Sequence, residues 1–310
     1  MRAAFADEIT RLAADDERVV LLAGDIGNRL FDAFKAQYPG RFYNCGIAEA
    51  NMIGIAAGLA ACGFRPVCYT IAPFLTYRCM EQIRVDVCYH HMPVALVGTG
   101  SGLAYASLGA THHSCEEAGM LRLLPGMTVL APADPMEVRA CLRAALGHGG
   151  PSYMRIGKKG EPAVHRAMPD FRIGESLVLR RGHDASLLVS GVLAPVALAA
   201  AELLEGKGVS LEVISCPTLK PLDTETLARA FGARRLVATL EEHSVLGGFG
   251  GAVAEWLSDQ PKCAARLLRF GTRDEFLHET SDQEEARGHF GLTPAAIAAG
   301  IRAALSPASE

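Results

Sequence analysis

Short runs of Val, Leu and Ile alternate along the chain with longer segments rich in Ala, Leu, Glu and Arg. Continuous apolar runs are typical of strands buried on both faces, and the longer segments are typical of the helices that connect parallel strands. The pattern therefore predicts the α/β class, with two parallel-sheet βα domains. In the first half, strands are predicted at 19–23, 42–45, 66–70, 94–98, 128–131 and 152–156, with helices between them.

A polar segment at 157–172 contains Gly and Pro but no hydrophobic period, so we predict a linker there. Beyond it the alternation starts again. Strands are expected at 185–190, 211–215, 236–240 and 267–270, and helices at 195–204, 224–231 and 248–256. The chain is accordingly divided into one domain at 1–165 and a smaller one at 175–310.

Composition and charge exclude several classes of protein. Half of the 310 residues are hydrophobic, which indicates a packed core rather than disorder. The net charge of -4 leaves no basic excess for nucleic acid or an anionic membrane, so neither is expected as a partner. Segment 1–20 mixes acids with apolar residues, unlike a signal peptide, and we expect a cytoplasmic protein. The nine cysteines include no C-x-x-C pair, so we interpret them as reduced apolar fillers.

An acid opens a helix that is rich in Gly and Ala. Glu49 follows the strand predicted at 42–45 and stands in the first turn of a helix that continues through Gly54 and Gly58. One interpretation is that its carboxylate complements the helix N-terminal dipole, and the segment taken alone favours this. The other is a desolvated carboxyl that holds or moves a proton at a ring nitrogen.

A glycine-rich loop follows the strand predicted at 94–98 and leads to His112 and His113. Loops at the carboxyl ends of parallel strands are where α/β proteins bind ligands. Adjacent histidines on a loop seldom converge on one zinc ion, so no metal site is expected. Because imidazole titrates near neutral pH, a polar or catalytic role is favoured.

Two further segments carry weaker signals. Asp25 follows the first strand, where an Asx turn is the simpler interpretation. Residues 239–251 resemble an anion-binding turn, but their glycine spacing matches neither the dinucleotide fingerprint nor the P-loop. Ser101 lies in G-x-G-S-G rather than G-x-S-x-G, which argues against a serine hydrolase.

Taken in order, these segments resemble the C-terminal half of transketolase-type thiamine-diphosphate enzymes. The motifs that carry the resemblance are GIAEANMIGIAAGLA, FLTYRCMEQIRVDVCYHHMPVALVG, GATHHS with MTVLAPADPMEV, and LEEHSVLGGFGGAVAE. The family's metal signature Gly-Asp-Gly does not occur, since Gly24 and Asp25 are followed by Ile26. The resemblance implies one subunit of a split transketolase. Its partner would be an N-terminal diphosphate-binding subunit that supplies the Mg2+ and diphosphate ligands in an α2β2 heterotetramer.

The resemblance also implies roles for single residues. Glu49 would hydrogen-bond the aminopyrimidine nitrogen of thiamine diphosphate and promote loss of the thiazolium proton. His112 would face the reacting carbon and stabilise substrate oxygens. The other matched positions would contact cofactor or substrate: Phe74 and Tyr77 at the pyrimidine, Ile71 where an aromatic usually stacks, Asp25 and Ile26 under the cofactor, and Arg2 at a substrate anion.

Three positions depart from the sugar-phosphate transketolases. Leu108 replaces an acid that reads an acceptor hydroxyl, Gly100 replaces a loop histidine, and Ala131 replaces a phosphate-binding arginine. An unpaired buried polar group costs about 1–3 kcal/mol, so the resemblance implies a less hydroxylated or unphosphorylated acceptor, a small sugar, ketone or aldehyde. Arg29 and Arg155 are candidates for an alternative anion contact.

Two other interpretations stay open. The β subunit of a 2-oxo acid dehydrogenase E1 component shares both domains, the Glu and a His-His segment, but residues 80–98 followed by GATHHS are closer to split transketolases. A scaffold subunit that only completes its partner's fold would tolerate Glu49→Gln. The sequence names neither the ketol donor nor the acceptor.

Overall fold

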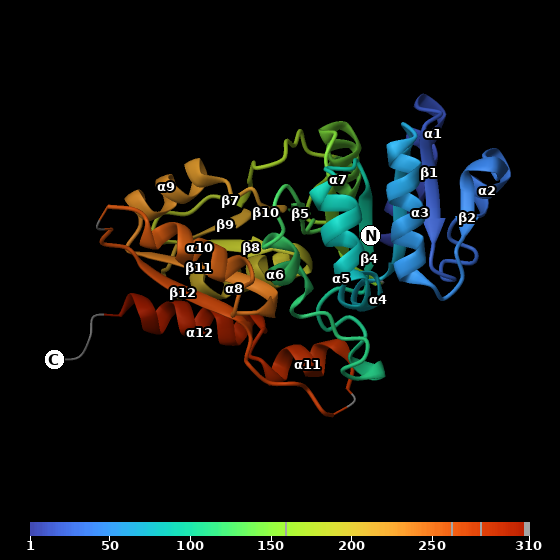
Figure 1. Cartoon of the computed structure of the whole chain (residues 1–310). Helices are drawn as coiled ribbons and strands as arrows, with labels where there is room; N and C mark the ends of the chain where they lie inside the picture. Colours follow the sequence, from blue (N-terminus) through green and yellow to red (C-terminus); the bar gives the residue numbers. More distant parts are fainter. Residues whose placement is uncertain (159, 262, 280, 307–310) are drawn as a thin grey trace.

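Two mostly parallel sheets form the framework of the chain (Figure 1). The computed structural model describes residues 1–158, 160–261, 263–279 and 281–306, and Lys159 of the predicted linker lies outside them. Figure 1 shows the first half of the chain on the right and the second half on the left. The predicted α/β class is confirmed.

The first sheet has seven strands in the order β10-β5-β6-β4-β3-β1-β2. Neighbouring strands are parallel except β10 and β5, which are antiparallel. The strands are β1 (Val19–Ala23), β2 (Phe42–Asn44), β3 (Arg65–Ile71), β4 (Ala95–Thr99), β5 (Thr128–Leu130), β6 (Ser152–Ile156) and β10 (Thr218–Lys220). All residues of β1, β4 and β6 are buried, as in strands covered on both faces.

Helices cover both faces of this sheet. Successive residues of β1 point to opposite faces, so Leu21 joins the cluster formed with α1, α2 and α7, and Leu22 joins the cluster formed with α3, η3 and α6. The helical segments of this half are α1 (Arg2–Asp15), α2 (Asp32–Gln37), η1 (Pro39–Arg41), α3 (Glu49–Ala61), α4 (Ala72–Thr76), η2 (Tyr77–Cys79), α5 (Met80–Gln82), the π-helix η3 (Ile83–Tyr89), η4 (Ala106–Leu108), α6 (Glu117–Arg122) and α7 (Pro135–His148).

The second sheet has five strands in the order β12-β11-β8-β9-β7, with β7 antiparallel to β9. One face is covered by α8 and α12 and the other by α9 and α10. The strands are β7 (Leu177–Arg180), β8 (Ala185–Ser190), β9 (Leu211–Ser215), β11 (Leu236–Ser244) and β12 (Arg266–Thr272). The helices are η5 (Gly191–Leu193), α8 (Ala194–Glu205), α9 (Thr224–Ala233), α10 (Phe249–Ser258), α11 (Gln283–His289) and α12 (Pro294–Leu305).

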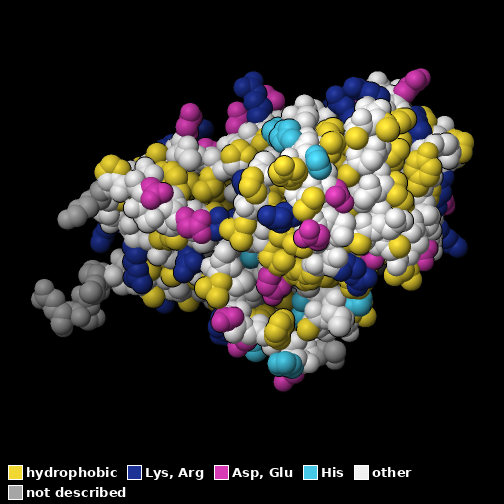
Figure 2. Space-filling model, viewed as in Figure 1, with side chains coloured by type: hydrophobic (Ala, Val, Ile, Leu, Met, Phe, Trp, Pro, Cys, Tyr) yellow, Lys and Arg dark blue, Asp and Glu magenta, His cyan; other side chains and the backbone are white. Residues whose placement is uncertain are grey.

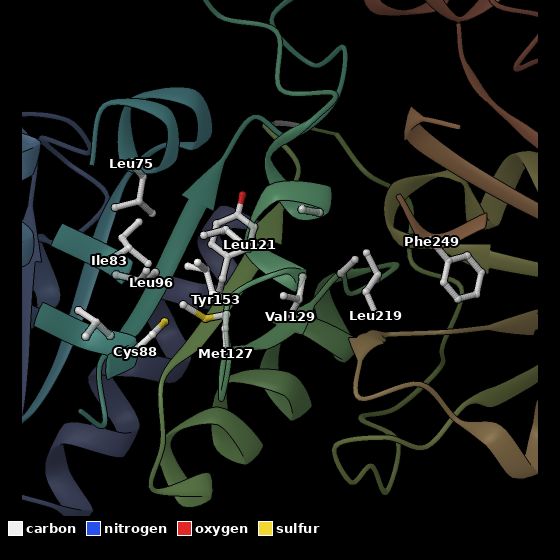
Figure 3. Close-up of a cluster of buried hydrophobic side chains, with 14 of the residues drawn as sticks. Leu75, Ile83, Cys88, Leu96, Leu121, Met127, Val129, Tyr153, Leu219 and Phe249 are labelled. Carbon is white, nitrogen blue, oxygen red and sulfur yellow. The ribbon is translucent and has the colours of Figure 1, made fainter. Parts of the chain in front are cut away.

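One apolar core joins the two halves (Figure 3). It runs from Leu75 and Ile83 through Tyr153 and Val129 of the first sheet to Phe249 of α10. Strand β10, although it follows β9 in the chain, pairs with β5 of the first sheet. The halves therefore share buried surface and a sheet edge, and are not connected by a linker alone.

The hydrophobic pattern locates the central strands and misses others. The strands predicted at 19–23, 152–156, 185–190 and 211–215 coincide with β1, β6, β8 and β9. The pattern predicts neither β7 nor β10, which are short antiparallel strands at sheet edges. Strand β11 extends past residue 240 because the side chains of Glu241 and Glu242 are buried and accept hydrogen bonds there.

Candidate active site

The candidate residues gather at the carboxyl edge of four neighbouring parallel strands. Asp25 follows β1, Ile71 ends β3 and Gly100 follows β4, while Glu49 begins α3 soon after β2. Phe74 lies on the short helix α4 that continues directly from β3. Ligand sites of α/β proteins lie at this edge because the connecting loops converge there.

Glu49 is the buried acid of this edge. Its side chain is 3% exposed, and one carboxylate oxygen, Oε2, accepts a hydrogen bond from Nη1 of Arg78 at 3.1 Å. The Arg78 side chain is 48% exposed. A Cβ atom added at Gly24 would lie 3.5 Å from Cγ of Glu49 and 3.0 Å from Oγ1 of Thr70, so glycine leaves room for the acid. Glu49 is thus a buried carboxylate with a half-exposed cationic partner.

An aromatic row runs beside the acid. The rings of Phe74 and His112 meet edge to face with centroids 5.0 Å apart, and the centroid of the Tyr105 ring lies 5.8 Å from that of His112. The Arg78 guanidinium lies 4.4 Å from the centre of the Phe74 ring. Nδ1 of His112 is 2.9 Å from Oγ1 of Thr111. Burial lowers the pKa of His112, and the charges of neighbouring groups lower it further, so the imidazole is neutral at pH 7.

Gly100 makes room for the Tyr105 ring. Its φ is +77°, and a Cβ there would collide with the ring atoms of Tyr105. The Nζ atom of Lys158 lies 4.3 Å from the centre of the same ring. Burial raises the pKa of Tyr105, and the positive charge of Arg2 opposes that rise. Two cations therefore lie around Tyr105, near the position where the family's loop histidine is missing.

The remaining predicted residues lie around this edge with fewer contacts. The Asn44 amide donates a hydrogen bond to Oδ1 of Asp25 at 2.9 Å, and Asp25 adopts a positive φ of 54°. Ile26 and Ile71 are partly buried. Leu108 is 51% exposed on η4 and presents no polar group to a ligand.

Tyr77 is hydrogen-bonded to an acid at a cavity between the halves. Its hydroxyl donates a 2.6 Å hydrogen bond to Oε2 of Glu116. Burial and the nearby charges of Glu117 and Glu116 raise the pKa of Tyr77. Tyr77 lines a cavity of about 540 Å3 between the halves, together with residues of the 272–277 segment. Its hydroxyl is therefore engaged by Glu116.

Two candidate anion contacts are already occupied by groups of the chain itself. Arg155 is 6% exposed, forms a 2.9 Å ion pair with Glu117 and donates to the carbonyl oxygens of Ser114 and Glu242, so it cannot reach a substrate. The turn at 239–251 binds no external anion through the start of α10. The backbone N–H groups of Phe249 and Gly250 already donate to the carboxylate of Glu241.

His243 of the same segment is structural. Its Nε2 accepts from the backbone N–H of Gly119 at 3.1 Å, so the ring proton is on Nδ1, which donates to the carbonyl oxygen of Ser244 at 2.9 Å. Burial and the charge of Arg155 lower the pKa of His243 to about 4. This buried neutral imidazole joins α6 of the first half to β11 of the second.

Sequence reasoning missed Arg78, Tyr105 and Lys158. Arg78 follows Phe74 by one helical turn, so the spacing held a usable signal. Lys158 lies in the polar segment taken as a linker. Its place depends on the pairing of β4 with β6, which the hydrophobic pattern does not predict. Thr99 pairs with Ile156, and this pairing places the residues after both strands at the same edge.

Lys, Arg, Asp and Glu side chains are interspersed over the face shown in Figure 2. The prediction that the cysteines are apolar fillers is wrong for Cys62 and Cys263, which are exposed.

Across the described ranges, no three His, Cys, Asp or Glu side chains are grouped to hold a metal ion. No helix in the part of the chain described has the length and apolar character needed to cross a membrane.

Two protein-family models match the chain. The model of the transketolase pyrimidine binding domain matches residues 1–161, and the model of the transketolase C-terminal domain matches residues 174–297.

Individual proteins agree with these matches. A 6-deoxy-6-sulfo-D-fructose transketolase subunit of Clostridium sp. is 36% identical over 98% of this chain and 93% of its own length. The 1-deoxy-D-xylulose-5-phosphate synthase 2 of Geobacter sulfurreducens is 37% identical over 96% of this chain, which spans only 48% of that protein. The solved structure of a split gene transketolase, an inactive beta4 tetramer, has a TM-score of 0.90 at 34% identity, covering 98% of this chain and 97% of that one.

Proposed function

The chain belongs to the transketolase family, and on that premise we propose that Glu49, Phe74 and His112 form the catalytic wall of a ketol-transferring enzyme completed by a partner chain. The observation that carries the proposal is the buried carboxylate of Glu49, whose partner Arg78 also lies over the ring of Phe74, which in turn contacts His112. The named relatives are transketolase subunits and a deoxyxylulose-phosphate synthase, which favours ketol transfer over the E1 alternative.

The residues of this wall fit the ring of thiamine diphosphate, the cofactor that the family implies. Glu49 offers one carboxylate oxygen whose hydrogen-bond partner is a half-exposed arginine, and Phe74 offers an aromatic face. When bound, thiamine diphosphate supplies a nucleophilic thiazolium carbon. Ile71 and Ile26 would add apolar contacts, and Asp25 would lie below the cofactor at the end of β1.

Glu49 would hold a proton at a carboxylate oxygen and share it with the ring nitrogen. Burial excludes water from this hydrogen bond, which strengthens it and keeps the proton on one path. The position at the start of α3 fixes the backbone of Glu49, so the side chain is oriented before the ligand arrives. Phe74, one helix away, would hold the ring against the carboxylate.

His112 would act on the substrate oxygens. Its imidazole is neutral near pH 7, so one ring nitrogen can accept a proton while the other donates. Nδ1 lies 2.9 Å from the Thr111 hydroxyl, which orients the ring and leaves Nε2 for the substrate. The edge-to-face contact with Phe74 holds the histidine beside the cofactor wall.

The partner chain would complete the site. The chain matches the Clostridium transketolase subunit over nearly its whole length but spans half of the Geobacter synthase. We place the diphosphate and Mg2+ ligands on an N-terminal subunit, in a cytoplasmic α2β2 heterotetramer. The pyrimidine-binding domain would cover 1–165 and the C-terminal domain 175–310.

The acceptor would lack the usual phosphate and hydroxyl contacts. Leu108 is exposed and apolar, Gly100 lies under Tyr105, and Ala131 is fully buried. An anionic group would instead meet Arg2 and Lys158 beside Tyr105. The Clostridium relative is named for a 6-deoxy-6-sulfo sugar, which is an anionic sugar without a phosphate group.

A reconstitution experiment tests this function. The chain is combined with a partner that carries the diphosphate-binding domain, thiamine diphosphate and Mg2+, and product masses are followed. Transfer of a two-carbon ketol unit between a ketose and an aldehyde is expected. Decarboxylation of a 2-oxo acid without ketol transfer would instead support the E1 alternative.

A further inference from the structure

We propose that Arg78 caps the cofactor-ring site, in the free chain and in the assembled complex before the cofactor is bound, and must swing out before thiamine diphosphate binds. This inference rests on the proposed function, because it takes Glu49 and Phe74 as the residues that receive the ring. The Arg78 guanidinium contacts both: Nη1 donates to Glu49 at 3.1 Å, and the guanidinium carbon lies 4.4 Å from the centre of the Phe74 ring.

The guanidinium of Arg78 resembles the aminopyrimidine ring in the features that Glu49 and Phe74 would recognise. Both groups are planar, both present N–H donors, and both can lie on an aromatic face. Arg78 therefore uses the hydrogen-bond acceptor of Glu49 and the apolar face of Phe74 at the same time. A cofactor ring placed on the same two groups cannot coexist with the guanidinium.

Glu49 and Arg78 differ in burial, and the difference allows the arginine to act as a removable cap. Glu49 is 3% exposed, and a buried carboxylate without a partner is costly, so the free chain gains from a cation there. Arg78 is 48% exposed, and among the described residues Glu49 is its one hydrogen-bond partner. The arginine can return to water at low cost, whereas the acid cannot.

Arg78 is accordingly a positioning residue, since it acts through Glu49 and leaves when the cofactor ring arrives. Its effect on affinity follows from competition. If the capped arrangement holds ~70–90% of the molecules, the apparent dissociation constant is raised about three- to tenfold over that of the open site. Removing the cap should therefore tighten cofactor binding, and it should lower the stability of the free chain against unfolding.

Calorimetric titration of the reconstituted complex with thiamine diphosphate at saturating Mg2+ tests the cap. Arg78→Gln removes the cation and leaves a shorter, neutral polar side chain, so it should tighten binding about three- to tenfold. Arg84→Gln, an exposed arginine of the neighbouring η3 helix, is the matched control and should leave affinity unchanged. Equal or weaker binding by Arg78→Gln would overturn the cap. Absence of binding by the wild-type complex would instead contradict the proposed function.

A second measurement uses the free chain and does not depend on assembly. Urea unfolding is compared for the wild type, Arg78→Gln, Glu49→Gln and the double variant. The cap predicts that Arg78→Gln lowers stability when Glu49 is present and has little effect when Glu49→Gln is also present. Identical effects of Arg78→Gln in both backgrounds would show that the two side chains are not coupled and would overturn the cap.

Discussion

The ammonium group of Lys158 lies 4.3 Å from the centre of the Tyr105 ring. The two residues come from loops after neighbouring strands, β6 and β4, and their contact brings a positive charge toward His112, whose ring lies 5.8 Å from Tyr105. Burial, His113 and Lys158 all lower the pKa of His112. A charge outside the predicted site residues therefore helps to keep the proposed catalytic histidine neutral.

Lys158→Met should shift the titration of His112. Removing a like charge favours the imidazolium, so the pKa of His112 should rise toward its ordinary value of about 6.5. Activity that requires neutral His112 would then be lost at a higher pH on the acid side. NMR titration of the ring proton on Cε1 measures the shift directly. An unchanged or lower pKa of His112 in the variant would show that the charge of Lys158 does not depress the pKa of His112.

Phosphorylated aldoses should be poor acceptors. The resemblance to sugar-phosphate transketolases implies that Leu108, Gly100 and Ala131 replace an acid, a histidine and an arginine that would bind them. If each contact is worth ~1 kcal/mol in the transition state, their joint loss lowers kcat/KM about a hundredfold. Rates with ribose 5-phosphate or erythrose 4-phosphate are compared with those for a small unphosphorylated aldehyde. Phosphorylated sugars reacting fastest would mean that other groups rebuild the phosphate site.

Arg2 should select for anionic acceptors. It begins α1, and its charge is felt at Tyr105, beside the pocket wall. A charge-assisted contact of ~1.5 kcal/mol corresponds to about a tenfold effect. Arg2→Met should therefore lower kcat/KM about tenfold for a sulfonated or phosphorylated acceptor and little for a neutral one. An equal loss for both kinds of acceptor would point to a structural role for Arg2.

Much of this site could be predicted because it depends on strand order. Glu49, Phe74 and His112 each follow a strand that the hydrophobic pattern locates, so their meeting at one sheet edge follows from parallel pairing. Edge strands were harder to predict from the sequence. Strand β10 is stabilised by pairing with β5, a contact between distant parts of the chain that no local pattern records.

The charged segment of β11 shows the other limit. The run Glu241, Glu242, His243 reads as polar loop, yet all three side chains are buried because each finds a partner on another element. The sequence makes Arg155 a candidate anion contact, but its side chain is buried and forms an ion pair with Glu117. Such partners lie far apart along the chain, so burial of a charge depends on tertiary pairing that sequence periodicity does not contain.

The uncombined chain should bind thiamine diphosphate weakly or not at all. The proposal assigns its diphosphate and metal ligands to the partner, and Arg78 already contacts Glu49 and Phe74. Calorimetry with Mg2+ should show little heat for the lone chain and clear binding for the complex. Tight, Mg2+-dependent binding by the lone chain would remove the split-enzyme interpretation.

Exchange of the thiazolium C2 proton tests the role of Glu49 most directly. In the reconstituted complex, NMR follows the exchange of this proton for deuterium in the wild type and in Glu49→Gln, which keeps the side-chain volume. Glu8→Gln is the control, because Glu8 is an equally buried carboxylate paired with Arg11 and Arg143 away from the site. Exchange should fall by about a hundredfold or more in Glu49→Gln and persist in Glu8→Gln. Wild-type exchange rates in Glu49→Gln would show that Glu49 only completes the start of a helix.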